Sequence, residues 1–152
     1  MEQIKIEIIK QLDNVRNETT SDFSAFATLR QNDQIIQWNY VSGNTNNRYK
    51  NMIGRPGKGL AGFVIRADRA MVIDESTPNY LQKRLDYPIM LAENLQAAVA
   101  VPVKADNKTV GVLVIGSRTA KTYTSRELKN IDVTAEALAS AYHKRKDNIS
   151  IK

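Results

Sequence analysis

Residues 97–116, with the sequence AAVAVPVKADNKTVGVLVIG, decide the fold class of this chain. Valine and isoleucine dominate two runs within it, 97–104 and 109–116, and such runs are typical of β-strands. Only the segment ADNK, at 105–108, separates the two runs, and a connection this short predicts a hairpin. The chain is therefore expected to contain an antiparallel sheet.

A second hairpin is expected closer to the N-terminus. Residues 23–30 and 35–42 carry the apolar, β-branched and aromatic side chains of two strands, and the polar segment between them predicts a turn. Helical patterns surround the hairpins, at 1–16, 59–67, 78–85, 88–94 and 124–146, and a short buried strand is expected at 70–74. Hairpins near both ends, with helices around and between them, indicate an α+β fold.

Chain length suits one domain, since the 152 residues have a mass of 17.1 kDa. We expect a single domain over 1–152, with an N-terminal helix at 1–16, the sheet and a pocket at 17–120, and a helix and tail at 121–152. No apolar run approaches the roughly 20 residues that span a bilayer. No basic and apolar leader opens the chain, so we expect a cytoplasmic protein without membrane contact.

Charge and composition exclude several classes of site. Lys and Arg number 22 and Asp and Glu 16, so the formal net charge is +6, which favours anionic partners. There is no cysteine, which excludes disulfides, cysteine-ligated metals and thiol nucleophiles within the chain. The single histidine, His143, excludes a histidine-rich metal site. We expect no cofactor and no enzymatic activity.

Two motifs resemble those of the GAF domain family. Gly57-Lys58-Gly59-Leu60-Ala61-Gly62 matches the glycine-rich start of a helix in that family. Val101-Pro102-Val103, followed by Gly111-Val112-Leu113, matches its paired strands. The resemblance covers nearly the whole chain. It implies a central antiparallel sheet with the N- and C-terminal helices on one face. Loops and short helices then cover a ligand pocket on the other face.

Within this family the chain is similar to the NreA-type nitrate receptors, through Trp38 and the Tyr-Pro-Ile-Met segment at 87–90. That resemblance implies a nitrate site made by the indole of Trp38 and the backbone amides of three apolar residues. The residues implied at the site are Trp38, Leu60, Ala61 and Ile89, with Gly59, Tyr87, Pro88 and Met90 around them. It further implies a sensor histidine kinase as partner, restrained by the anion-free receptor and released by nitrate. A homodimer through the terminal helices is also implied.

The residue pattern favours an anion site on physical grounds as well. The first N–H groups of a helix have no partner within the helix, and the helix dipole adds about +0.5 charge there. Leu60 and Ala61 lie where a glycine-rich loop is expected to become a helix, and Ile89 follows a proline at a second helix start. Two such ends meeting in one pocket would hold a weakly hydrated, singly charged anion without a basic side chain.

Other interpretations remain open. Gly57, Gly59 and Gly62 also match the spacing of a dinucleotide-binding loop, but Arg55-Pro56 precedes them instead of a strand. A GAF domain could instead bind a larger ligand such as a cyclic nucleotide. Asp74, Glu75 and Glu93 could suggest paired carboxylates, although surface acids are far commoner.

The basic run at 143–146 is more typical of a solvated helix end than of a nucleic-acid surface, since no aromatic residues accompany it. We expect no nucleic-acid partner.

Overall fold

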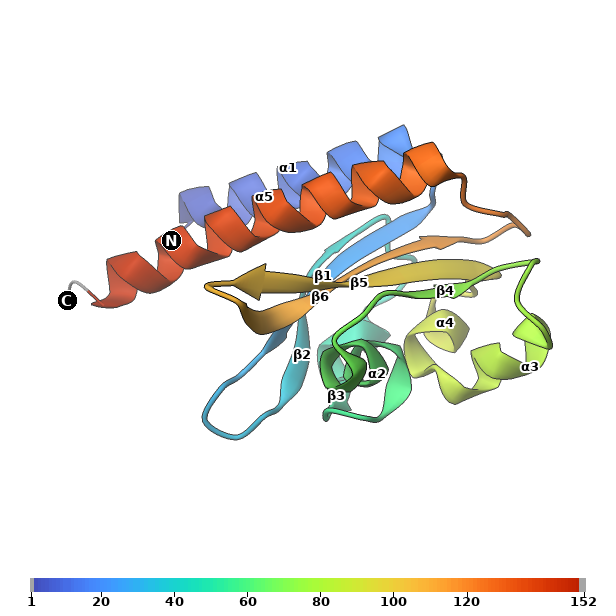
Figure 1. The fold of residues 1–152 in the computed structure, drawn as a ribbon, viewed down its shortest axis with the longest axis horizontal. Helices are drawn as coiled ribbons and strands as arrows, with labels where there is room; N and C mark the ends of the chain where they lie inside the picture. Colours follow the sequence, from blue (N-terminus) through green and yellow to red (C-terminus); the bar gives the residue numbers. More distant parts are fainter. Residues whose placement is uncertain (1, 151–152) are drawn as a thin grey trace.

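A computed structural model gives the backbone of residues 2–150 and the side chains of residues 3–143. Six antiparallel strands form one sheet (Figure 1). In spatial order the strands are β3 (Ile53–Gly54), β2 (Ile36–Ser42), β1 (Phe23–Leu29), β6 (Lys108–Ser117), β5 (Ala97–Ala105) and β4 (Met71–Ile73). The two expected hairpins lie side by side through the pairing of β1 with β6.

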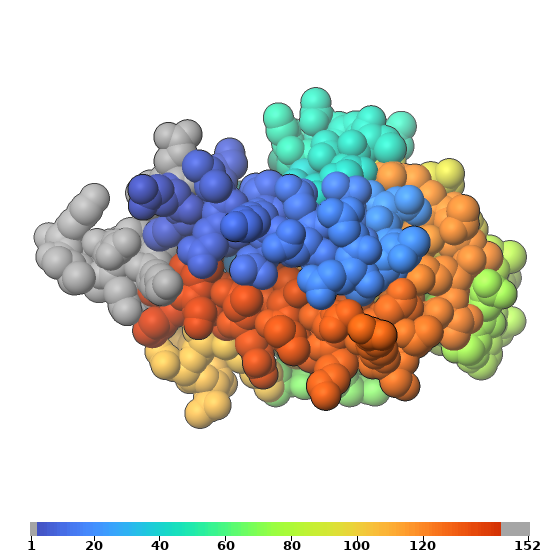
Figure 2. All heavy atoms as spheres, turned by 90° about the horizontal axis from the view of Figure 1, so that it is seen from above, coloured from blue at the N-terminus to red at the C-terminus, as the bar shows by residue number. Residues whose placement is uncertain are grey.

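Two long helices, α1 (Glu2–Glu18) and α5 (Ser125–Ser150), cover one face of the sheet. Figure 2 shows them running next to each other, with α1 in blue and α5 in orange-red. Ile8, Leu12 and Val15 of α1 are fully buried, as their helical spacing predicts. Ile131 and Leu138 of α5 join them in one core cluster.

The opposite face carries short elements: α2 (Gly59–Ala67), α3 (Tyr80–Lys83), α4 (Pro88–Ala92) and the 3-10 helices η1 (Arg48–Asn51) and η2 (Arg84–Asp86). A second core cluster lies beneath them. It includes Trp38, Leu60, Val64, Ile89 and Met90. The sheet therefore separates a helix layer from a layer of loops and short helices, the arrangement that the GAF resemblance implied.

Strand β2 contributes to both layers because its pairing with β1 is irregular. Trp38 pairs with Ala27 and Tyr40 pairs with Phe26, so Asn39 has no opposite residue. An extra residue of this kind is a β-bulge, which bends the strand and re-aims its side chains. As a result Trp38 lies in the cluster beneath the short helices, whereas Tyr40 lies in the cluster beneath α1 and α5.

The segment at 43–57, which lies between the expected strand at 35–42 and the expected helix at 59–67, has regular structure of its own. It contains η1 and the two-residue strand β3, which pairs with Ile36 and Gln37 of β2. A strand of two residues is too short to show an alternation of apolar and polar side chains in the sequence. Its pairing depends on contact with β2, which composition does not reveal.

The helices at the pocket are shorter than expected. The predicted helix at 78–85 starts later, at Tyr80, because Asn79 adopts a left-handed conformation, and its second half is the 3-10 helix η2. The predicted helix at 88–94 stops at Ala92, and Asn94 is left-handed (φ 54°). In the basic run, Lys144, Arg145 and Lys146 lie outside the residues whose side chains are described.

Candidate functional site

A cavity of 680 Å³ opens between the sheet and the short helices. Its lining comes from four parts of the chain: β2, the segment from η1 to β3, the start of α2 and the start of α4. The lining residues are Ile36, Trp38, Asn51, Met52, Ile53, Gly54, Arg55, Lys58, Gly59, Leu60, Ala61, Gly62, Asp86, Pro88 and Ile89. The expected binding residues Trp38, Leu60, Ala61 and Ile89 thus share one cavity, together with Gly59 and Pro88.

Trp38 presents a hydrogen-bond donor to this cavity. The residue is 8% exposed, and no acceptor among the described residues takes its indole N–H. In the described part of the chain, Oε2 of Glu93 is the sole side-chain polar atom that is both sealed from solvent and without a hydrogen-bond partner. The indole nitrogen has no partner either, so it is not sealed and a ligand can reach it. An indole nitrogen can only donate. The cavity wall therefore offers one fixed donor on a large apolar surface.

Helix α2 begins at the cavity. Lys58 is extended and lacks a capping side-chain hydrogen bond, so the first amides of the helix depend on other acceptors. Leu60 and Ala61 are almost fully buried there, at 2% and 4% exposure. The loop before the helix folds back on it, since the amide of Gly57 donates to the carbonyl of Gly62 at 2.7 Å. Two buried residues of the first turn therefore line the cavity.

The start of α4 lies on the other side of the cavity. Pro88 occupies the first turn and has no N–H, and the carbonyl of Tyr87 accepts from Met90 at 2.9 Å and from Leu91 at 3.3 Å. Ile89 is 2% exposed and lines the cavity, whereas Tyr87 and Met90 are absent from its lining. Among the amides of this turn, that of Ile89 is thus the one free to donate toward a ligand.

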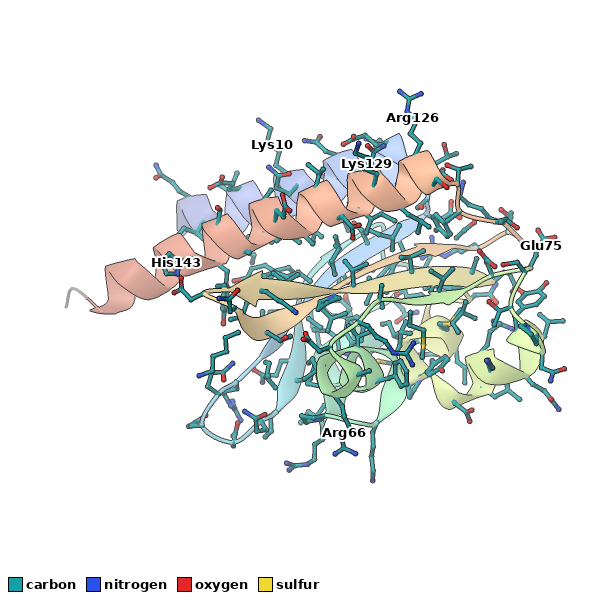
Figure 3. All side chains as sticks on the ribbon, in the orientation of Figure 1. Lys10, Arg66, Glu75, Arg126, Lys129 and His143 are labelled. Carbon is teal, nitrogen blue, oxygen red and sulfur yellow. The ribbon has the colours of Figure 1, made fainter. Side chains whose placement is uncertain are left out.

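Charge at the cavity is mixed. Arg55, Lys58 and Asp86 line it, and all three side chains are exposed. Burial raises the pKa of the neighbouring Tyr87 phenol, and the charge of Asp86 adds to the rise, so this group is neutral at pH 7. Arg66 projects from α2 on the side away from the terminal helices (Figure 3).

The three acidic residues considered from sequence do not form a catalytic pair. The carboxylate of Asp74 accepts from the amide and the hydroxyl of Ser76, at 2.9 and 2.6 Å, so Asp74 shapes a turn. Glu75 is exposed in the connection after β4 (Figure 3). Glu93 is fully buried and pairs with Arg118 at 2.5 Å. In the described part of the chain, no three His, Asp or Glu residues are arranged to hold a metal ion.

Several lining residues were not predicted. Ile36, Met52 and Ile53 carry no chemical signal beyond apolar character, and their place depends on the pairing of β2 with β3. Arg55 was noted only as the residue before Pro56. A basic residue directly before the glycine-rich segment was the one available signal that a charged group lies at the cavity.

Comparison with known proteins gives a family and a set of structural relatives. The GAF domain model matches residues 10–143. No protein of curated function matches the sequence. Within the described residues, no helix is long and apolar enough to cross a membrane.

Three solved structures illustrate the likeness. NreA of Staphylococcus aureus, mutated in its nitrate binding site, is 40% identical, with a TM-score of 0.69 over 77% of this chain and 87% of that one. A hypothetical protein of S. aureus is 39% identical, with a TM-score of 0.67 over 77% and 97%. A type II free methionine-R-sulfoxide reductase of Thermoplasma acidophilum is 16% identical, with a TM-score of 0.72 over 94% of each chain, and shows likeness of fold alone. The family match, together with the six-stranded sheet between two layers, shows that the chain belongs to the GAF domain family.

Proposed function

We propose that this protein is a cytoplasmic receptor for nitrate that regulates a sensor histidine kinase and has no catalytic activity of its own. The observation that carries the proposal is that the residues with these donors, an indole N–H and the first amides of two helices, line a single cavity. Trp38, Leu60, Ala61 and Ile89 supply these donors. The 40% identity to S. aureus NreA, a protein with a nitrate binding site, supports the choice of ligand.

The donor set suits a singly charged anion better than a multiply charged one. Backbone amides at helix starts favour negative charge without carrying a full positive charge. Phosphate and sulfate generally require Arg or Lys in direct contact. Arg55 and Lys58 are exposed at this cavity, whereas its buried lining residues have no charged side chain. Nitrate loses less hydration free energy than phosphate when it moves from water into such a cavity.

Occupancy can act as a signal if the two states of the protein bind the anion unequally. The elements that bound the cavity, η1, β3 and α4, are each at most five residues long, so each has few contacts that fix its position. A ligand that binds one arrangement of these elements better shifts the population toward it. The kinase would prefer the other arrangement, so that nitrate relieves its restraint.

An alternative ligand is suggested by the size of the cavity. Pockets for drug-sized molecules measure about 300–1,000 Å³, and the cavity measures 680 Å³. A four-atom anion leaves much of this volume to water or to a closing movement. A cyclic nucleotide or another larger ligand would fill more of it. A reductase of the methionine sulfoxide type is not proposed, because the chemistry of those enzymes requires thiols and the chain has no cysteine.

Isothermal titration calorimetry with sodium nitrate and sodium phosphate tests the proposal. We expect saturable nitrate binding with one site per chain and at least tenfold weaker phosphate binding. Phosphate binding as tightly as nitrate would contradict the proposed selectivity. Binding of a cyclic nucleotide in place of nitrate would support the alternative.

A further inference from the structure

Arg118 joins four separate segments at one end of the sheet. It follows β6 directly and lies in the connection to α5. Its Nε donates to the carbonyl of Glu93 at 2.9 Å, and its Nη2 donates to the carbonyl of Gly43 at 3.0 Å. Its amide donates to Oδ2 of Asp22 at 2.7 Å. The four segments are thus the ends of α4, β2 and β6 and the turn between α1 and β1.

Glu93 is the partner of Arg118 on the cavity side. Its side chain is fully buried, and Oε1 accepts from Nη2 of Arg118 at 2.5 Å. The same oxygen accepts from the amide and the hydroxyl of Thr45, at 2.8 and 3.1 Å. Glu93 follows Ala92, the last residue of α4, whose carbonyl accepts from Asn46 at 2.7 Å. The end of α4 is therefore tied to the loop after β2.

The other side of Arg118 reaches the helix layer. Asp22, which accepts its amide, lies in the turn that leads from α1 to β1. In that turn Ser21 shares a hydrogen bond of 3.0 Å with the hydroxyl of Tyr123, just before α5. The turn thus links the ends of α1 and α5 that lie nearest to Arg118.

One oxygen of Glu93 has no partner. Oε2 is sealed from solvent and accepts no hydrogen bond in the described part of the chain. An unpaired buried carboxylate oxygen lowers stability, since its hydration is lost without replacement. The ion pair of Glu93 and Arg118 therefore does not give the highest stability that this position could have.

We propose that Glu93 and Arg118 are positioning residues that couple the cavity wall to the turn between α1 and β1. A shift of α4, whose start supplies Pro88 and Ile89 to the cavity, moves Glu93 at its end. Arg118 transmits that shift to Asp22 because its guanidinium and its amide bind the two sides. The coupling extends the proposed function by naming the path from the ligand to the helix layer.

Amide hydrogen exchange of the ligand-free protein tests the coupling. Glu93→Gln keeps the size of the side chain and removes its charge. Arg118→Lys keeps the charge and removes the forked donor geometry, and it serves as a second variant if the first does not fold. Lys104→Gln is the matched control, because it removes an exposed ion pair to Asp68 (2.8 Å) on the same fold. Amides at Val112–Val114, in the centre of the sheet, serve as the internal reference for global unfolding.

We expect exchange at Ser21 and Asp22 to rise at least fivefold relative to the sheet reference in Glu93→Gln or Arg118→Lys, and to stay unchanged in Lys104→Gln. Faster exchange confined to residues 43–46 and 92–95 would overturn the proposal. A uniform rise across the sheet would overturn it as well, since it would mean general destabilisation. The experiment contains no ligand, so a failure of nitrate to bind would contradict the proposed function and leave this result intact.

Discussion

Trp38 and Tyr40 are two residues apart on β2, yet they lie on opposite sides of the sheet. In a regular strand residues two apart face the same way. The unpaired Asn39 between them breaks this rule, since Trp38 pairs with Ala27 and Tyr40 with Phe26. The indole consequently reaches the cavity, while the ring of Tyr40 stacks on Phe26 at 5.9 Å beneath the helices.

Trp38→Phe should weaken nitrate binding without unfolding the protein, since it keeps an aromatic ring and removes the one side-chain donor proposed for the anion. A hydrogen bond to a charged group contributes about 1.5–3 kcal/mol. We therefore expect the dissociation constant, measured by calorimetry, to rise roughly 10- to 100-fold. Ile36→Val, which trims an apolar group of the same cavity, is the control and should change it less than threefold. Unchanged affinity in Trp38→Phe would remove the indole from the site.

Gly62→Ala should disturb the glycine-rich loop. A Cβ at this position would come within 2.3 Å of the carbonyl oxygen of Arg55, so the loop has to move. Overpacking of this kind costs about 1–3 kcal/mol, and we expect that loss of stability in urea unfolding together with weaker nitrate binding. Gly54 lines the same cavity, and the atom nearest to an added Cβ is Cβ of Ile36 at 3.4 Å, so Gly54→Ala should change stability by less than about 0.5 kcal/mol. Equal effects of the two variants would contradict the close approach.

Thr124→Ala should lower stability through the start of α5. The hydroxyl of Thr124 accepts from the amide of Glu127 at 3.1 Å, and the carboxylate of Glu127 accepts from the amide of Thr124 at 2.9 Å. Loss of such a cap costs about 1 kcal/mol, which corresponds to roughly 2–4 °C in the unfolding midpoint for a chain of this size. Thr122→Ala, at an exposed position before the helix, should leave the midpoint unchanged.

Tyr123→Phe should change how stability depends on alkaline pH. Burial raises the pKa of the Tyr123 phenol well above its usual range, and its hydrogen bond to Ser21 opposes the rise without cancelling it. The neutral phenol is thus favoured in the folded state. The contribution of this phenol to the free energy of unfolding is complete below about pH 10, where the phenol titrates in the unfolded chain. It is lost as the pH rises through the pKa that the phenol has in the folded protein.

At pH 7 the Tyr123→Phe variant should be less stable by about 1 kcal/mol, the net value of one hydrogen bond. Between about pH 10 and 12 the difference in unfolding free energy should shrink or reverse, because only the wild-type protein carries the buried phenol. A difference that stays constant over this range in urea unfolding would contradict the role of burial.

Features set by neighbouring residues were predictable from the sequence. The capping box joins Thr124 to Glu127, three residues further on, and this Thr-x-x-Glu spacing is itself a sequence signal for the start of a helix. The apolar stripe of Ile8, Leu12 and Val15 predicted the buried face of α1. Likewise, the glycine-rich segment predicted the start of α2 at Gly59.

Features set by contacts between distant segments were not predictable in this way. The bulge at Asn39 depends on the register of β1 against β2, and nothing in the local pattern of β2 indicates it. The ion pair of Glu93 and Arg118 joins residues 25 positions apart, and each resembles an ordinary surface charge in the sequence. The placement of Trp38 at the cavity came from family resemblance, because an isolated tryptophan is more often a core or rim residue.

Thermal unfolding with increasing nitrate tests whether the cavity is a nitrate site, with chloride, phosphate and cyclic nucleotides as parallel series. A ligand at 100 times its dissociation constant adds about 2.7 kcal/mol to the stability of the state that binds it, which raises the midpoint of a domain this size by several degrees. We expect that rise with nitrate and a much smaller one with chloride or phosphate. No rise with nitrate, or an equal rise with every salt, would contradict this expectation.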